Sequence, residues 1–240
     1  MFAHCLADYS NLRLWSHGRS PNPADVRHGL DELAAASQAA TKDRGIVLTE
    51  LTLRLYGGWH EQSSGQTRDR QIASKVARSY PTRTTRHCRV RVELAEAPVS
   101  QPSLRFHETL RPGTSSLPRL RTGLRPACSR SGALCEHLQA LHSWLAGSCP
   151  KEGCPTNLQD VLDGRRQKAV DTLICVDAMS LAASNLTDIV LIASDDDDIV
   201  PAMLSARQHN KPVFCLYRRN AERLTYRDLL DEVGVEIHQW

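Results

Sequence analysis

The last third of the chain alternates short apolar strands with helical segments, and this pattern constrains the fold more than any other feature. Helices are expected over 164–184, 199–209 and 222–232, and strands over 188–193, 212–216 and 235–238. Strands separated by single helices form parallel sheets, because each helix returns the chain to the edge where the previous strand began. The sequence therefore predicts an α/β fold of three layers, with helices covering a mainly parallel sheet.

The first 95 residues fit the same fold. Strands are expected over 1–8, 46–56 and 88–94, and the second and third alternate apolar and polar residues. A helix is expected over 23–41, with Asn22 as its cap. A basic helix is expected over 67–79. From about 97 to 158, prolines and glycines break the pattern, apart from one helix over 133–145. We expect a single domain over 1–240 that carries a Pro/Gly/Cys-rich insertion at about 97–160.

Charge is distributed unevenly along the chain. The net charge is only +3, but residues 65–126 contain thirteen Lys and Arg against four Asp and Glu. Such a segment suits a solvated surface or a polyanion, and the planar guanidinium of arginine matches phosphate. Nucleic acid is therefore a candidate partner, with Arg83, Arg86, Arg89 and Arg91 as candidate contacts.

No apolar run approaches the roughly 18 residues of a membrane helix, and the first residues do not resemble a signal peptide. We expect a cytoplasmic protein without membrane contact.

Acidic residues stand where strands are expected to end. Asp8 closes the first strand, and four aspartates follow the strand at 188–193 in the stretch LIASDDDDIVPA. A helix through 164–184 would place Lys168 and Asp171 on one face. Aspartates at a helix start can simply cap it, but carboxylates gathered from separate elements repel one another unless a cation lies among them. Mg²⁺ and Mn²⁺ are the cations that prefer such oxygens.

Three short motifs resemble those of the NYN domain, a branch of the PIN-like nuclease group with a Rossmann-like fold. They are ADYSNL, KAVD and SDDDDIVP, which supply Asp8 and Asn11, then Lys168 and Asp171, then Ser194, Asp196, Asp198 and Pro201. The resemblance implies that Asp8, Asp171, Asp196 and Asp198 hold Mg²⁺ or Mn²⁺, and that Asn11 and Ser194 orient the site or substrate. The chain departs from the family pattern at Asp195, where glycine is usual, and at Ile199, where an aromatic residue is usual.

The leading hypothesis is a metal-dependent nuclease that hydrolyses phosphodiester bonds, with RNA favoured over DNA. The alternative is a nucleic-acid-binding module of the same fold with little catalysis, because Asp195 adds a carboxylate to the site. A phosphohydrolase for small phosphate esters fits less well, since it would not need an extended basic segment. Asp197 is expected to face solvent or to cap the next helix.

Four cysteines lie in the insertion at spacings C-x6-C-x13-C-x4-C: Cys128, Cys135, Cys149 and Cys154. Zinc takes four such ligands, and an insertion without an obvious core would gain stability from it. The alternative is a set of reduced cysteines packed as small hydrophobic residues. Trp59 follows two glycines and reads as a packed loop residue, although it could also stack on a base.

Overall fold

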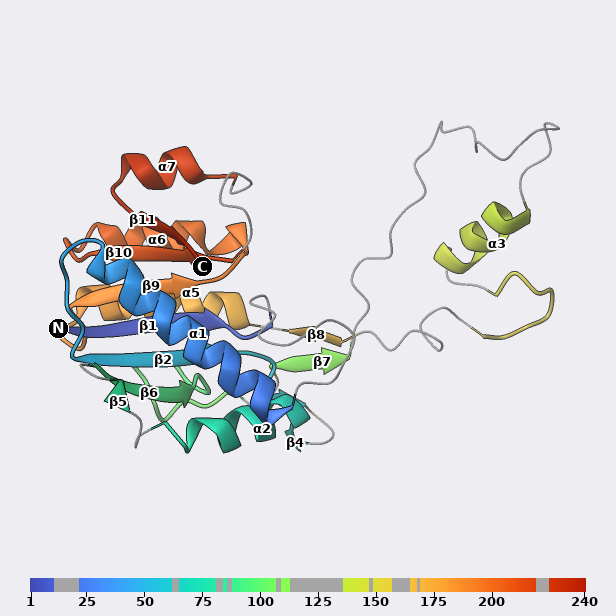
Figure 1. Ribbon diagram of the computed structural model, residues 1–240. Coiled ribbons are helices and arrows are strands. Elements are labelled where there is room, and N and C mark those ends of the chain that lie inside the picture. Colours follow the sequence, from blue (N-terminus) through green and yellow to red (C-terminus); the bar gives the residue numbers. More distant parts are fainter. Residues whose placement is uncertain are drawn as a thin grey trace. The chain divides into compact units, whose positions relative to one another are not determined.

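The computed structural model describes most of the chain (Figure 1), and the ranges that it describes are 1–10, 22–61, 65–80, 84–85, 88–106, 109–112, 136–146, 149–156, 165–167, 169–218 and 225–240. Within these ranges the chain forms two compact units. The first comprises Met1–Leu110 and Gln167–Trp240, and the second comprises Arg111–Arg166.

A seven-stranded sheet organises the first unit, in the order β11-β10-β9-β1-β2-β6-β5. The strands, in chain order, are β1 (Phe2–Asp8), β2 (Glu50–Tyr56), β5 (Thr84–Thr85), β6 (Cys88–Leu94), β9 (Ile189–Ala193), β10 (Val213–Tyr217) and β11 (Glu236–Gln239). Every neighbouring pair is parallel except β5 with β6. Because β1 lies in the centre, between β9 and β2, the carboxyl ends of these three strands meet at one edge of the sheet.

Helices cover both faces of this sheet (Figure 1). On one face, α1 (Pro23–Lys42) and α2 (Arg68–Ala77) pack on side chains such as Cys5 and Leu191. On the other face, α5 (Val170–Ala183) and α6 (Val200–Arg207) pack on Leu6 and Ile192, together with Leu230 of α7 (Arg227–Glu232). Alternate residues of a strand point to opposite faces, so each central strand contributes to two apolar cores. The predicted three-layer α/β fold is confirmed.

Several predicted boundaries hold closely. The Asn22 side chain accepts hydrogen bonds from the backbone N–H groups of Ala24 and Asp25, at 2.8 and 3.0 Å, and so caps α1 as expected. The strand predicted over 88–94 is β6 without change. The helix predicted over 164–184 is wrong at its start, because residues Arg165–Gln167 form strand β8 and Ala169 adopts a left-handed conformation with φ 63°.

The remaining elements are short. Strands β3 (His60–Glu61), β4 (Gly65–Gln66), β7 (Leu110–Pro112) and β8 form a second sheet in the order β4-β3-β7-β8. The second unit contains α3 (Glu136–Leu145), inside the predicted helix over 133–145. The described helices include none with the length and apolar character needed to cross a membrane. The single domain with an insertion at about 97–160 stays a prediction; residues 97–110 belong to the first unit.

Candidate functional site

Asp8 is the last residue of the central strand β1, and its side chain is only 1% exposed. Its Oδ1 atom accepts a hydrogen bond from the backbone N–H of Ser10 at 3.0 Å, which turns the chain away from the strand. The parallel register pairs Ala7 with Ala193 of β9. Asp8 and Ser194 directly follow this last pair of β1 with β9, so they lie side by side at the carboxyl edge.

The residues after β9 form a compact turn that leads into a helix. The Oγ atom of Ser194, 2% exposed, accepts from the backbone N–H of Asp196 at 3.1 Å. Oδ1 of Asp196 then accepts from the backbone N–H of Asp198 at 3.0 Å and caps the 3₁₀ helix η1 (Asp197–Ile199). Ile199, where the NYN pattern usually has an aromatic residue, is fully buried in the core beneath α6.

Asp171 reaches the same edge from α5. It lies in the first turn of that helix, and Gln167, just before the helix, donates a hydrogen bond from Nε2 to the hydroxyl of Ser10. Partial burial raises the pKa of Asp171, and the nearby carboxylates of Asp196 and Asp198 raise it further. The expectation that Lys168 and Asp171 share a helix face stays a prediction, and α5 begins at Val170. Lys168 itself lies outside the described residues.

The structure thus places Asp171 near Asp196 and Asp198, and Asp8 ends the strand that neighbours β9 at the same edge of the sheet. Parallel α/β sheets bind ligands at this edge. Among the residues that the structure describes, no three His, Cys, Asp or Glu side chains converge as a group that could hold a metal ion. Mg²⁺ takes oxygen ligands and usually keeps several waters, so carboxylates at this edge could hold it directly or through bound water.

The other two aspartates of the run point elsewhere. Oδ1 of Asp195 accepts from the backbone N–H of Arg218 at 3.0 Å, and Oδ2 of Asp197 accepts from the Thr225 hydroxyl at 2.6 Å. Asp197 is half-buried, and the residue that caps η1 is Asp196.

Two of the four candidate arginines can be placed. Arg89 and Arg91 are exposed on β6, and Arg91 lies 3.9 Å from Glu50. Arg89 is in register with Glu50, whereas Asp8 is in register with Tyr56, six residues further along β2. At ~3.3 Å per residue, the backbone of Arg89 lies about 20 Å from the carboxylate edge along the strands, and that of Arg91, in register with Thr52, lies about 13 Å from it. Arg83, Arg86 and Asn11 lie outside the described residues.

In the second unit, Cys149 and Cys154 are brought together by a closed turn. The backbone N–H of Cys154 donates to Lys151 O and that of Cys149 donates to Thr156 O, each at 3.1 Å, and Gly153 has φ +73°. Hydrogen bonding with Thr156 and then with Cys149 lowers the pKa of the Cys154 thiol. Both cysteines are free thiols, and Cys128 and Cys135 lie outside the described residues.

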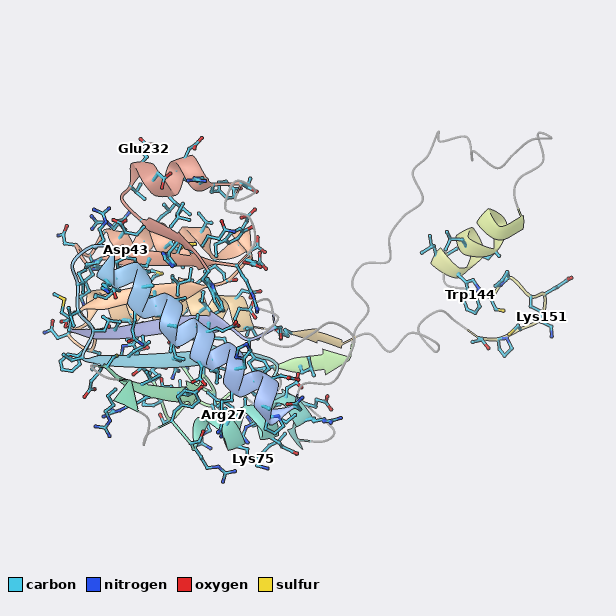
Figure 2. The ribbon with its side chains drawn as sticks, viewed as in Figure 1. Arg27, Asp43, Lys75, Trp144, Lys151 and Glu232 are labelled. Atoms are coloured by element: carbon cyan, nitrogen blue, oxygen red, sulfur yellow. The ribbon has the colours of Figure 1, made fainter. Side chains whose placement is uncertain are left out.

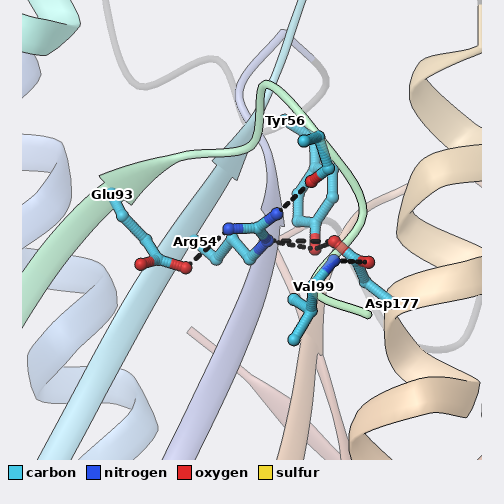
Figure 3. A network of polar contacts seen from close by, with 6 residues as sticks. Arg54, Tyr56, Glu93, Val99 and Asp177 are labelled. Atoms are coloured by element: carbon cyan, nitrogen blue, oxygen red, sulfur yellow. Dashed lines mark hydrogen bonds and ion pairs between the residues drawn. The ribbon is translucent and has the colours of Figure 1, made fainter. Parts of the chain in front are cut away.

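One network that fixes α5 on the sheet was not predicted from sequence (Figure 3). Arg54 of β2 donates from Nε to Asp177 of α5 at 2.9 Å and from Nη1 to Glu93 of β6 at 2.7 Å. Asp177 also accepts from the Tyr56 hydroxyl and from the backbone N–H of Val99, both at 2.7 Å. Asp177 is fully buried six residues after Asp171, so its network holds the helix that carries Asp171.

Burial works against the charge of Arg54, but Tyr56, Glu93 and Asp177 together raise its pKa, so it stays protonated. Arg54 stands at a polar position of the alternating strand, so nothing in the sequence indicated that its side chain is buried. Its partners could not be read from sequence, because Asp177 lies 123 residues away.

Trp59 packs next to the end of β1, where Asp8 lies. It is fully buried, and its ring packs on that of Tyr9 with the centroids 5.1 Å apart. The expected packed loop residue is what the structure shows. Because Tyr9 follows Asp8 directly, this aromatic pair fixes the backbone where β1 ends.

Comparison with known proteins gives one match. The NYN domain family model matches residues 136–236, a range that includes Asp171 and the whole aspartate run. No curated protein and no solved structure matches the chain. The six-stranded parallel core, flanked by helices, agrees with a PIN-like fold. The predicted recognition is therefore confirmed: over residues 136–236 this chain matches the NYN domain, a nuclease-type family.

Proposed function

We propose that the protein is a metal-dependent nuclease that hydrolyses phosphodiester bonds in RNA. The observation that carries the proposal is the proximity of Asp171 to Asp196 and Asp198, which together with burial raise its pKa, at the sheet edge where Asp8 ends β1. Carboxylates that raise one another's pKa in this way are stabilised by a cation among them. The match to a nuclease-type family supports the same chemistry.

The four carboxylates would hold Mg²⁺ or Mn²⁺. Such an ion lowers the pKa of a bound water and offsets the charge that develops on the phosphate during hydrolysis. Asp8 is fixed by Ser10 N–H and by its place in the strand, and Asp196 is fixed by its cap on η1. Ser194 holds the turn between them and, with Asn11, would orient the site.

Exposed basic residues on both faces of the sheet support RNA as the substrate. Arg68 and Lys75 of α2, with the C-cap residue Arg78, are exposed on the face that α2 covers. Cys88 and Val90 face the core under α2, so the exposed Arg89 and Arg91 of β6 leave the sheet on the opposite face. Figure 2 shows Lys75 projecting outward from α2. Each phosphate that such a residue neutralises on a single strand contributes about 0.7 to the slope of log K against log salt concentration. Arg89→Ala with Arg91→Ala should therefore lower that slope by up to about 1.4 and weaken binding while kcat is retained.

Activity with Mn²⁺ on panels of single-stranded RNA, structured RNA and DNA tests the proposal. Asp8→Asn and Asp196→Asn should abolish cleavage while RNA binding is retained, and EDTA should stop the wild type. Asp43→Asn is the matched control, because Asp43 caps the far end of α1, away from the carboxylate edge. RNA binding without cleavage under any divalent metal would replace this proposal with the binding module, for which Asp195 in place of glycine is the motivating feature. Cleavage of small phosphate esters alone would favour a phosphohydrolase.

We also propose that Cys149 and Cys154, with Cys128 and Cys135, bind structural zinc, and that the protein acts in the cytoplasm. The support for zinc is the turn that brings the Cys149 and Cys154 thiols together and the lowered pKa of Cys154, because thiolates are the zinc ligands. Zinc content of the purified chain, before and after Cys149→Ser plus Cys154→Ser, tests it. An equally low content in both overturns it.

A further inference from the structure

The four consecutive aspartates are divided by the direction in which their side chains point. In β9, Leu191 and Ala193 face the core under α1, whereas Val190 and Ile192 face the core under α5 and α6. Asp196 itself has extended backbone angles, φ −100° and ψ 124°, but the chain bends at Asp195. The partners of each carboxylate therefore show which way its side chain points.

Asp195 and Asp197 contact one neighbouring segment, the connection from β10 to α7. Asp195 accepts from the backbone N–H of Arg218, the residue that follows β10, at 3.0 Å. Asp197 accepts from the hydroxyl of Thr225, two residues before α7, at 2.6 Å. Hydrogen bonds to an ionised carboxylate are stronger and shorter than neutral ones, so these two contacts tie the turn to that connection.

Two cysteines on either side of the turn support this division. Burial raises the pKa of Cys215 in β10 to about 12, and Asp195 and Asp197 contribute to the increase. Burial also raises the pKa of Cys175 in α5, and there the contributing carboxylates are Asp171 and Asp198. One pair of the run therefore faces β10, and Asp198 faces α5 with Asp171.

We propose that Asp195 and Asp197 are positioning residues, which hold the turn after β9 on the β10–α7 connection so that Asp196 and Asp198 face Asp171. This inference rests on the proposed function, in which Asp196 and Asp198 bind the metal. Asp195 then acts as a hydrogen-bond acceptor that replaces the glycine of the family pattern, and it is not an added metal ligand.

A comparison of Asp195→Ala with Asp195→Asn tests the role of Asp195. Asparagine keeps an Oδ1 acceptor for the Arg218 N–H but removes the charge, whereas alanine removes both. Asp195→Ala should lower kcat with Mn²⁺ by roughly ten- to hundredfold, because small displacements of a site cost that much, and should raise the Mn²⁺ concentration for half-maximal activity. Asp195→Asn should retain most of the wild-type kcat, with KM for RNA unchanged in both. Equal losses in the two variants would show a charge requirement and overturn the positioning role.

Thr225 offers a test of Asp197 that leaves the acidic run intact. Thr225→Val removes the hydroxyl donor and should reproduce the kcat loss of Asp197→Ala, and the double variant should lose no more than either single variant. Additive losses would overturn the proposed contact. Asp228→Ala is the control, because Asp228 is an exposed carboxylate in the first turn of α7.

Amide hydrogen exchange gives a readout that does not depend on catalysis. Asp195→Ala should speed exchange of the Arg218 amide by at least tenfold, and Asp195→Asn should leave it close to wild type. An unchanged Arg218 amide in Asp195→Ala overturns the inference. If the wild type neither cleaves RNA nor binds Mn²⁺, the proposed function fails, and the exchange result still decides whether Asp195 holds the turn.

Discussion

Asp177→Ala offers the sharpest test of how α5 is held on the sheet. The carboxylate accepts from three buried or half-buried donors, on Arg54, Tyr56 and Val99, at 2.7 to 2.9 Å, and its side chain is 0% exposed. Removing one partner of a buried ion pair costs about 3–5 kcal/mol, since the remaining charge stays buried. The contact of Arg54 with Glu93, whose side chain is 46% exposed, offsets part of this cost and places the expected loss nearer ~3 kcal/mol.

Urea and thermal unfolding followed by circular dichroism measure this loss. In chains of this length, 1 kcal/mol corresponds to about 2–4 °C in Tm, so a loss of ~3 kcal/mol lowers Tm by about 6–12 °C. The control is Asp188→Ala, because exposed Asp188 also accepts a backbone hydrogen bond, from Phe2 at 2.8 Å, and should lose only about 0.5–1.5 kcal/mol.

The reasoning would be refuted if Asp177→Ala destabilised the protein no more than Asp188→Ala. Replacing both partners, as Arg54→Met with Asp177→Leu, should recover much of the loss, because apolar pairs of similar volume often match buried ion pairs in stability. Failure of that recovery would assign the loss to packing of α5 and not to the unpaired charge.

Three further outcomes are expected. Asn22→Ala should destabilise the protein by about 1 kcal/mol in urea unfolding, because two N–H groups of α1 lose their acceptor, and Asn22→Asp should be neutral; equal losses would contradict the capping role. Cys154 should be alkylated by iodoacetamide at pH 7 well before Cys215, since the lowered pKa of Cys154 favours thiolate and burial raises the pKa of Cys215 to about 12; mass spectrometry of the labelled peptides decides the order. Stability should fall as pH rises above about 10, because the pKa of Tyr56 is raised well above that of an unfolded tyrosine, so the unfolded chain releases its proton first. Tyr56→Phe should flatten this fall in a pH series of urea midpoints, and an unchanged slope would show that Tyr56 does not cause it.

The sheet strands and covering helices were readable from periodicity because burial leaves a direct mark on sequence. Cys88–Leu94 alternates, and β9 and β10 are short continuous apolar runs between helical segments. The start of α5 was misjudged, since the left-handed Ala169 has no residue signature such as glycine. The small strands β3, β4, β5, β7 and β8 were missed because two or three residues carry no periodicity.

In the candidate site, too, some features were readable from sequence and others were not. By itself the sequence determined the fold class and the resemblance to the NYN domain, because strand periodicity and short motifs are local features. It also predicted Asp8, Asp171, Asp196 and Asp198 as the site carboxylates. Only the tertiary structure decided which aspartates of the run face α5 and which face β10, since that depends on where the backbone turns after β9. It also decided that Arg54 and Asp177 pair. A buried charge such as that of Arg54 requires a partner of opposite charge, but that partner can come from any part of the chain that folding brings close.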